Sequence, residues 1–115
     1  MDTFPYNGTT TTCEALWMGV PVVTLYGDTH QSRVGLSLLR QCGLDELAAA
    51  SSEEYVQKSV ALASDRQRLQ KFHSELRPIL SSSSLVDGEG FCNRLESAYR
   101  SMMENLAGAT RAEGA

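Results

Sequence analysis

The feature that most constrains the fold is the apolar, β-branched run from Pro21 to Tyr26, which reads Pro-Val-Val-Thr-Leu-Tyr. A run that is apolar at nearly every position is typical of a strand buried on both faces, as in parallel sheets. Helical patterns lie on either side of it, one from the threonines at 9–12 to Gly19 and one that ends at Gly43. The order helix, strand, helix therefore predicts an α/β fold with a parallel sheet.

Two weaker strands are expected in the same half of the chain. Residues 2–6 form a short segment that Pro5 would close, and residues 44–50 read as a turn followed by an edge strand. The helix that ends at Gly43 is expected to bury one face, formed by Val34, Leu38 and Cys42. The strand at 21–26 needs sheet neighbours on both sides, so apolar surface left open along it would favour pairing with another polypeptide.

The second half of the chain is predicted to be helical. Ser52 heads one helix, and Asp65 caps a second one that Pro78 ends. The expected inward faces of these two helices are Val56, Val60 and Ala63, and then Leu69, Phe72, Leu76 and Ile79. A terminal helix carries the longest apolar stripe, namely Phe91, Leu95, Ala98, Tyr99, Met102, Met103 and Leu106. We expect residues 1–50 to form a partial Rossmann-like unit, 51–108 to be helices of the same domain, and 109–115 to be a frayed tail.

Size and charge narrow the class of protein. The chain has 115 residues and a formal net charge of −4, which fits one small acidic domain and argues against nucleic acid or membrane as its main partner. The sequence shows no signal peptide and no apolar stretch long enough to span a membrane. Its three cysteines are widely spaced, which is typical of reduced thiols and predicts a cytoplasmic protein.

The segment Asn7-Gly8-Thr9-Thr10-Thr11-Thr12-Cys13-Glu14 contains the candidate functional site. A glycine and a run of hydroxyls at a helix start suit phosphate, because the first turn has unpaired N–H groups and a partial positive charge. Glu14, one turn later, is placed to accept from the paired hydroxyls of a sugar. The alternative is purely structural: Thr11 and Glu14 have the spacing of a capping box. Spacing alone leaves both interpretations open.

Residues 2–25, with the threonine run followed by Glu-Ala-Leu-Trp-Met-Gly-Val-Pro, closely resemble the end of the catalytic domain in the O-linked N-acetylglucosaminyltransferase and SPINDLY family. The similarity continues through residues 27–35 and covers roughly residues 2–103. These enzymes carry tetratricopeptide repeats and have the two-Rossmann GT-B architecture. Four threonines followed by Glu14 are more similar to bacterial and SPINDLY-type members than to the animal enzyme. The resemblance implies the C-terminal part of a GT-B donor-binding domain with a helical C-terminal segment.

The resemblance also implies roles for particular residues. Thr10 and Thr11 would bind the diphosphate of a nucleotide-sugar, with Thr9 lining the phosphate site, Gly8 allowing close approach and Glu14 holding the ribose hydroxyls. The implied reaction transfers N-acetylglucosamine from UDP-GlcNAc to Ser or Thr of a protein acceptor, without a cofactor or metal. The acceptor site, the base-contacting segment and the catalytic residues would lie upstream, so an isolated fragment of this length is expected to be inactive. Such a half-domain is also expected to self-associate, by edge pairing or by swapping.

Two alternatives to that function remain. One is protein O-fucosyl transfer from a GDP-sugar, as in the plant SPINDLY branch, and the other is a non-catalytic Rossmann-like module in which the threonines only cap the helix. Other side chains are expected to have structural roles only. Trp17, Met102 and Met103 are expected in the core, and Cys13 is expected to be a small buried residue. His30 and His73 are expected at the surface, and Arg33 in an ion pair with an acid.

Overall fold

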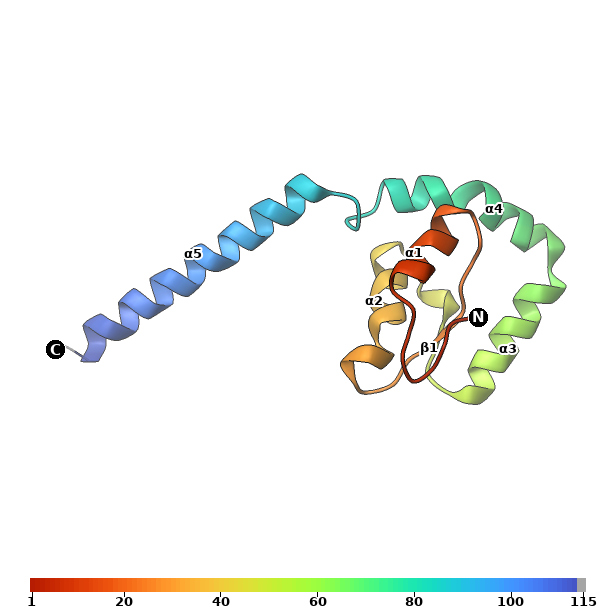
Figure 1. The fold of residues 1–115 in the computed structure, drawn as a ribbon, viewed down its shortest axis with the longest axis horizontal. Coiled ribbons are helices and arrows are strands. Elements are labelled where there is room, and N and C mark those ends of the chain that lie inside the picture. The colour runs from red at the N-terminus through yellow and green to blue at the C-terminus, as the bar shows by residue number, and fades with distance from the viewer. Residues whose placement is uncertain (114–115) are drawn as a thin grey trace.

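A computed structural model describes the backbone of residues 1–113 and the side chains of residues 1–108. Five α-helices, two short strands and two 3₁₀ turns are present in that part of the chain (Figure 1). In chain order they are α1 (Thr10–Trp17), β1 (Thr24–Leu25), η1 (His30–Ser32), α2 (Val34–Gln41), η2 (Asp45–Leu47), β2 (Ala48–Ala49), α3 (Ser52–Ser64), α4 (Arg66–Ser81) and α5 (Gly88–Glu113). The elements up to α4 gather into one lobe, and α5 extends away from it (Figure 1).

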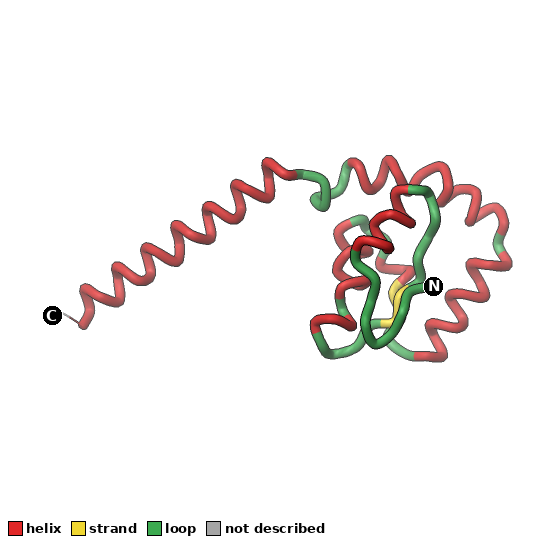
Figure 2. Tube along the Cα trace, in the orientation of Figure 1, coloured by secondary structure: helices red, strands yellow, loops and turns green. Residues whose placement is uncertain are grey.

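The sheet consists of β1 and β2, which run parallel with Thr24 opposite Ala48 and Leu25 opposite Ala49. The predicted order of helix, strand and helix is confirmed, and so is the edge strand after Gly43. The sheet is smaller than expected, because only two residues of the run 21–26 enter the ladder, although Val22 and Val23 are buried. Figure 2 shows how little of the chain is strand, and residues 2–6 form none.

The core of the lobe consists mainly of leucines and valines, which come from the helices α1 to α4 and from the segments around the two strands. Leu16 of α1, Leu39 of α2 and Leu76 of α4 are among its most deeply buried members. The ends of α1 and α2 follow the sequence signals: Gly19 and Gly43 have φ angles of 77° and 67°, the left-handed conformation that glycine adopts without strain.

The buried face of α2 differs from the expected one. Leu36 and Leu39 are buried, whereas Val34 and Leu38 are only half-buried. The third predicted member, Cys42, is half-buried and packs against the core as expected. The reason for the difference is Gly35: a Cβ at this position would collide with the hydroxyl of Thr24 and come within 2.7 Å of the Asp2 carboxylate. The glycine lets α2 approach the sheet closely, and that contact selects which of two apolar stripes faces inward.

The inward face of α3 was also predicted wrongly. Val56, Val60 and Ala63 are exposed, whereas Leu62 is buried and Tyr55 half-buried. The helix is oriented by a hydrogen bond from the Tyr55 hydroxyl to the Asp2 carbonyl oxygen, 2.6 Å long. Its N-cap is Ser51, one residue before the expected start, whose hydroxyl accepts from the Glu54 N–H.

The stripe predicted for α4 is confirmed: Phe72 and Leu76 are buried, and Leu69 and Ile79 half-buried. Asp65 caps this helix as expected by accepting from the Arg68 N–H at 2.9 Å. Pro78 does not end the helix, which continues to Ser81 although proline has no N–H donor and its ring crowds the preceding turn. Its carbonyl oxygen still accepts from the Ser82 N–H.

Trp17 was predicted to lie in the core, but it is exposed at the end of α1. The guanidinium of Arg77 lies 5.2 Å from the centre of its ring, and the Arg77 Nε donates to the Trp17 carbonyl oxygen at 2.9 Å. The indole therefore joins α1 to α4 at the surface of the lobe.

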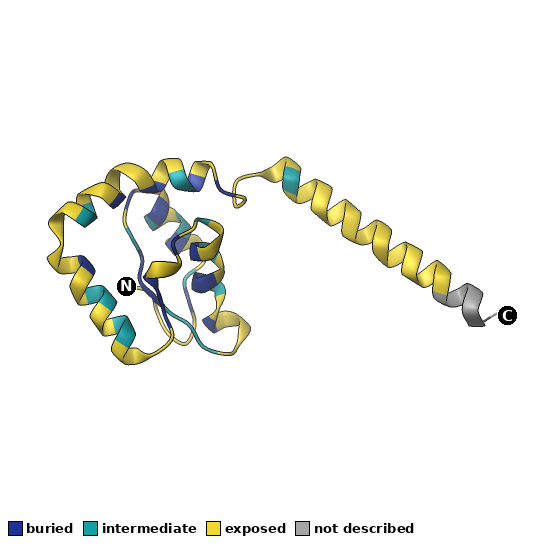
Figure 3. Cartoon of the chain, turned by 180° about the vertical axis from the view of Figure 1, so that it is seen from behind, coloured by how far each residue is buried: buried dark blue, intermediate teal, exposed yellow. Residues whose placement is uncertain are grey.

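The apolar stripe of α5 is exposed along its length (Figure 3). Met102 and Met103, predicted as core, are 63% and 66% exposed. The helix also continues past Gly108 to Glu113, beyond the expected start of the frayed tail, and residues 114–115 of that tail lie outside the described residues. No helix in the described part of the chain has the length and apolarity needed to cross a membrane.

Candidate functional site

The start of α1 has the unpaired amides that anion binding requires. Its first intrahelical hydrogen bond runs from the Cys13 N–H to the Thr9 carbonyl oxygen, 3.0 Å long. Within the described residues, the N–H groups of Thr10, Thr11 and Thr12 have no acceptor, as expected for the first turn of a helix. No side chain caps these amides, so the positive end of the helix remains accessible.

The predicted capping box is not formed. The helix begins at Thr10, so Thr9 is the N-cap residue and its hydroxyl makes no capping bond. Thr11 therefore lies inside the first turn, where a side chain cannot reach the amides that a cap satisfies. The structural alternative for Thr11 and Glu14 is thus wrong, because the helix starts two residues earlier than a Thr11 cap requires.

The structure brings the predicted site residues to the outer side of this turn. Thr9, Thr10, Thr11 and Glu14 are all exposed, and Gly8 is half-buried behind them. Glu14 lies four residues after Thr10 and three after Thr11, so the three side chains share one face of the helix. None of these hydroxyls, nor the Glu14 carboxylate, has a hydrogen-bond partner in the described part of the chain.

Gly8 has a structural role in addition to the expected one. A Cβ at this position would lie 2.6 Å from the Thr11 hydroxyl oxygen and 2.9 Å from that of Thr12. The glycine therefore lets the preceding loop lie directly against the first turn of α1.

Two residues whose roles the sequence did not predict, Asp2 and Asn7, hold this loop in place. Asp2 accepts from the Gly8 N–H through Oδ1 and from the Thr24 hydroxyl through Oδ2, at 2.8 and 2.7 Å. The side chain of Asn7 is 1% exposed and donates to the carbonyl oxygens of Thr3 and Leu25.

Asn7 also joins the loop to the segment around α2. Its Oδ1 accepts from the Gly35 N–H at 3.2 Å, and its own N–H donates to the Gln31 carbonyl oxygen at 2.9 Å. In the sequence, Asn7 and Gly8 form a pair that is typical of turns. The feature that could have indicated a fixed loop is the presence of Asp2 and Asn7, because Asp and Asn side chains commonly form hydrogen bonds with backbone groups.

A surface hollow of about 500 Å³ opens beside the α1 start. It is lined by Thr9 together with His30, Arg33, Val34, Ser37 and Leu38. Arg33 was expected to form an ion pair with an acid, but it forms none within the described part of the chain. Its Nη1 donates to the Gly27 carbonyl oxygen at 2.9 Å, and its guanidinium lies 5.5 Å from the Tyr26 ring centre. His30 is exposed at this hollow, as predicted.

Cys13 does not have the properties of a nucleophile. It is half-buried, and burial followed by the nearby Glu14 carboxylate raises the pKa of its thiol. The thiolate is therefore disfavoured at neutral pH. The same cause, burial, raises the pKa of Cys42, against the opposing effect of a hydrogen bond with Ser83.

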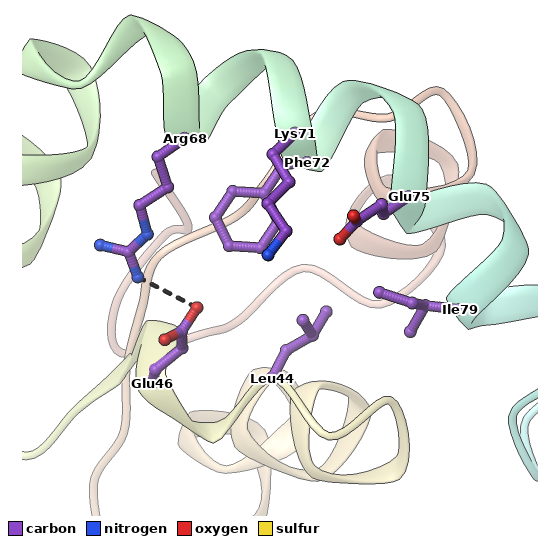
Figure 4. A pocket seen from close by; sticks show the side chains of 7 residues that line it. All are labelled: Leu44, Glu46, Arg68, Lys71, Phe72, Glu75 and Ile79. Atoms are coloured by element: carbon purple, nitrogen blue, oxygen red, sulfur yellow. Dashed lines mark ion pairs between the residues drawn. The ribbon is translucent and has the colours of Figure 1, made fainter.

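A second hollow of about 390 Å³ lies between α4 and the η2 turn and shares no lining residue with the first (Figure 4). Arg68 lies at one side of it, forms an ion pair with Glu46 at 3.0 Å, and has its guanidinium 5.6 Å from the Phe72 ring centre (Figure 4). Lys71 and Glu75 extend beside it from α4 (Figure 4). Its lining has two acidic and two basic side chains, so it offers no net positive charge to a phosphate group. The described residues also include no group of His, Cys, Asp or Glu arranged to hold a metal ion.

The fold matches a solved glycosyltransferase. A mutant of the O-GlcNAc transferase of Thermobaculum terrenum superposes with a TM-score of 0.80 at 48% sequence identity, over 88% of this chain and 19% of that chain. The small parallel sheet and its helices thus have the fold of part of an O-GlcNAc transferase, and the chain is similar to the glycosyltransferase class of proteins.

The sequence comparisons identify the family within that class. Residues 1–95 match the sequence model of the family described as "Glycosyl transferase family 41", and the chain belongs to that family. Probable UDP-N-acetylglucosamine–peptide N-acetylglucosaminyltransferases SPINDLY of Arabidopsis thaliana and Solanum lycopersicum are 53% and 51% identical over 102 residues. The corresponding transferase of Caenorhabditis elegans is 35% identical over 96 residues, or 84% of this chain and 8% of that protein. The chain spans 11% of the length of the two plant relatives, with 89% of its own length aligned.

Proposed function

We propose that the start of α1 binds the diphosphate of a nucleotide-sugar donor. The observation that carries the proposal is the set of three unpaired amides, at Thr10, Thr11 and Thr12, beside threonine hydroxyls that no capping bond occupies. Amides at a helix N-terminus and the helix dipole both favour a group with negative charge. Thr9 would line the phosphate site, and Gly8 would keep the loop clear of it.

Glu14 is proposed to hold the ribose of the same donor. Its carboxylate lies on the face of α1 that carries Thr10 and Thr11, about one turn further along the helix. An ionised carboxylate accepts hydrogen bonds from two neighbouring hydroxyls, which suits a ribose. A phosphate bound at the first turn would thus be followed by its sugar one turn along the helix.

For the whole enzyme, we propose transfer of N-acetylglucosamine from UDP-GlcNAc to Ser or Thr of a protein. Its relatives are named for a UDP-N-acetylglucosamine–peptide reaction of this kind. In this reaction the hydroxyl oxygen of the acceptor Ser or Thr forms a bond to the sugar carbon and loses its proton. The bond from the sugar to the diphosphate breaks, and negative charge develops on the leaving diphosphate. Amides fixed at the start of α1 would stabilise that charge without rearrangement, which is electrostatic catalysis that requires no metal ion or cofactor.

The proposal is tested by titrating UDP and UMP into the ¹⁵N-labelled chain and following backbone amide shifts by NMR. We expect shifts centred on residues 8–14. Because Thr11 would contact a phosphate group, Thr11→Val is expected to weaken UDP binding by roughly tenfold and UMP binding by less, as for one lost hydrogen bond to a charged group. Glu14→Gln would weaken both nucleotides equally, because both carry the ribose.

A matched control is Glu53→Gln, which neutralises an exposed glutamate in the first turn of another helix, α3, and should leave binding unchanged. Shifts that map to the hollow between α4 and η2, or that Thr11→Val leaves unaltered, would contradict the proposal. A titration with GDP compares the two bases, and preferred binding of GDP would favour the O-fucosyl alternative.

The same substitutions in a full-length family-41 enzyme provide the test of catalysis. Thr11→Val there is expected to lower kcat, because the developing charge loses a donor. EDTA is expected to leave the rate unchanged. A rate that falls with EDTA and returns with a divalent cation would overturn the metal-independent part of the proposal.

A further inference from the structure

A third surface hollow lies where the C-terminal end of α1 meets α4, and it has a volume of about 360 Å³. Its lining includes the apolar side chains of Trp17, Met18 and Pro78 and the polar side chains of His73, Ser74 and Arg77. Figure 1 shows this end of α1 lying against α4. The proposed phosphate site is at the other end of α1, which is about 12 Å away because the helix has eight residues. A ligand in this hollow would therefore leave the nucleotide site open.

The backbone around this hollow is fixed by contacts between α1 and α4. Gly19 has a φ angle of 77°, and a Cβ at this position would come within 2.6 Å of the His73 carbonyl oxygen. The last carbonyl oxygens of α1 all accept hydrogen bonds. Those of residues 14–16 accept from the N–H groups of residues 18–20, and that of Trp17 accepts from the Arg77 Nε. The end of α1 is thus held in one position on α4, and the hollow is formed before any ligand enters.

Arg77 is held in place, yet within the described residues no acid neutralises it. Its guanidinium lies 5.2 Å from the centre of the Trp17 ring, and its Nη2 donates to the Met18 sulfur at 3.7 Å. The N–H groups of Nη1 have no acceptor in the described part of the chain. By contrast, ion pairs with Asp or Glu are formed by Arg40, Arg68, Arg94 and Arg100. A fixed guanidinium with unused donors is suited to a carboxylate.

The other side chains of the hollow indicate what the carboxylate is attached to. Among the described residues no acid lines the hollow, although the whole chain has a formal net charge of −4. His73 and Ser74 add further polar groups beside Arg77. Trp17 and Met18 are 43% and 61% exposed, and Trp, Met and Arg are enriched at protein–protein interfaces. These apolar side chains would gain contacts from a polypeptide that a small inorganic anion cannot supply.

We propose that this hollow binds an acidic segment of a partner polypeptide. An Asp or Glu carboxylate of that segment accepts from the Arg77 guanidinium, whose planar N–H groups match the two carboxylate oxygens. A neighbouring apolar side chain of the same segment packs against Trp17, Met18 and Pro78. The hollow shares no lining residue with the first turn of α1, so the proposal is independent of the nucleotide site.

Trp17 is the only tryptophan of the chain, so its fluorescence reports directly on this hollow. The test titrates two peptides into the ¹⁵N-labelled chain, the acidic acetyl-Glu-Asp-Leu-Asp-Glu-amide and the neutral acetyl-Gln-Asn-Leu-Asn-Gln-amide. The acidic peptide is expected to change Trp17 fluorescence and to bind roughly tenfold more tightly than the neutral one, as for one hydrogen bond to a charged group. Amide shifts are expected at residues 17–19 and 73–78, and added salt is expected to weaken binding because the charges are at the surface.

Two exposed arginines of α4 provide a matched pair of variants. Arg77 lines the hollow, whereas Arg66 begins the same helix outside it. Arg77→Gln is expected to weaken binding of the acidic peptide by roughly tenfold, and Arg66→Gln to leave it unchanged, although both remove one positive charge. Circular dichroism checks that both variants are folded. Met18→Ala retains the guanidinium and is expected to weaken binding severalfold through the lost apolar contact, which keeps the test decisive if Arg77→Gln unfolds.

Three results would overturn the proposal. Equal binding of the acidic and neutral peptides, or equal effects of the two arginine variants, would show that net charge alone attracts the peptide. Inorganic phosphate that binds at residues 73–78 as tightly as the acidic peptide would show a site for simple anions. A change in Trp17 fluorescence that appears without peptide as the protein concentration rises would show that a second copy of the chain occupies the hollow.

Discussion

Helices α4 and α5 have similar sequence patterns and different environments. Both carry apolar residues at steps of three and four, and both follow a polar turn. In α4 the stripe is packed in the core, and Leu76 is 1% exposed, whereas Met102 in the stripe of α5 is 63% exposed. The comparison teaches that periodicity identifies the face of a helix that is suited to burial. It does not identify the surface that covers that face.

The two helices differ in what holds them. α4 packs against α1 and α3, and Arg77 adds contacts with Trp17. α5 follows residues 82–87, and the ion pairs of its side chains are local, between Arg100 and Glu96 and between Arg94 and Asp87. A helix that has only local contacts is marginally stable in water. The following predictions test this difference, beginning with the largest effect.

Truncating a side chain in each stripe gives the largest contrast. Leu76→Ala is expected to lower the free energy of unfolding by about 3 kcal/mol, because it leaves a cavity in the core. Met102→Ala should change that free energy by no more than about 0.5 kcal/mol, as at other exposed positions. Urea unfolding followed by circular dichroism measures both. Equal losses would mean that α5 is packed in solution, in contradiction to the structure.

Two asparagines, one in the lobe and one in α5, give a second comparison of the two regions. Asn7→Ala is expected to cost about 2 kcal/mol, because it leaves the Gly35 N–H and two carbonyl oxygens without their buried partner. Asn93→Ala in α5 removes an exposed side chain, and alanine favours helix, so no loss is expected. Urea unfolding of the two variants tests this, and a loss below about 0.5 kcal/mol for Asn7→Ala would show that the loop is not held by that residue.

Two arginines, one in α4 and one in α5, are expected to differ less in their contribution to stability. Arg77→Ala removes the contact with the Trp17 ring and a hydrogen bond, for an expected cost of about 1 kcal/mol. Arg100→Ala removes one exposed ion pair with Glu96, worth about 0.3–0.5 kcal/mol. Trp17 fluorescence should also change in the first variant only. A fluorescence change in both would contradict the separation of the lobe from α5.

The smallest expected effect concerns pH. The Ala50 N–H and then Lys58 lower the pKa of Glu54 at the start of α3. Its carboxylate is thus favoured in the folded state, and this contribution to stability is fully present above the unfolded pKa of about 4.3. It is lost as the pH falls through the lower, folded pKa.

A carboxyl titration by NMR should therefore place the Glu54 midpoint below the ordinary glutamate value. Glu54→Gln should remove part of the acid-induced loss of stability between pH 5 and 3, a range chosen about the ordinary glutamate pKa. Glu53→Gln serves as the control and should retain that loss. A Glu54 midpoint at or above the ordinary value would show that the Ala50 hydrogen bond is absent in solution.

The sequence predicted local structure better than it predicted faces. The α1 helix, the ends of two helices at Gly19 and Gly43, and the Asp65 cap are confirmed, because each depends on a few adjacent residues. The inward faces of α2 and α3 were predicted wrongly. Each helix has more than one apolar stripe, and the choice between them depends on Gly35 in one case and on Tyr55 in the other.

The candidate site shows the same division. The sequence located its residues, Gly8 to Glu14, and left open whether Thr11 was a cap. The structure decided this question, because the helix begins at Thr10 and leaves the hydroxyls of the threonines unused. The roles of Asp2 and Asn7 were not predicted, because their partners, Thr24, Leu25 and Gly35, are distant in the sequence.

By itself, the sequence determined the helices, the parallel strand and the segment that resembles a donor-phosphate site, since propensity, turn residues and hydroxyl runs act over a few residues. Only the tertiary structure decided which faces are buried, which loop is fixed and that α5 extends from the lobe. The physical reason is that burial and hydrogen bonding between distant segments depend on where the chain brings those segments together, and no local pattern specifies that.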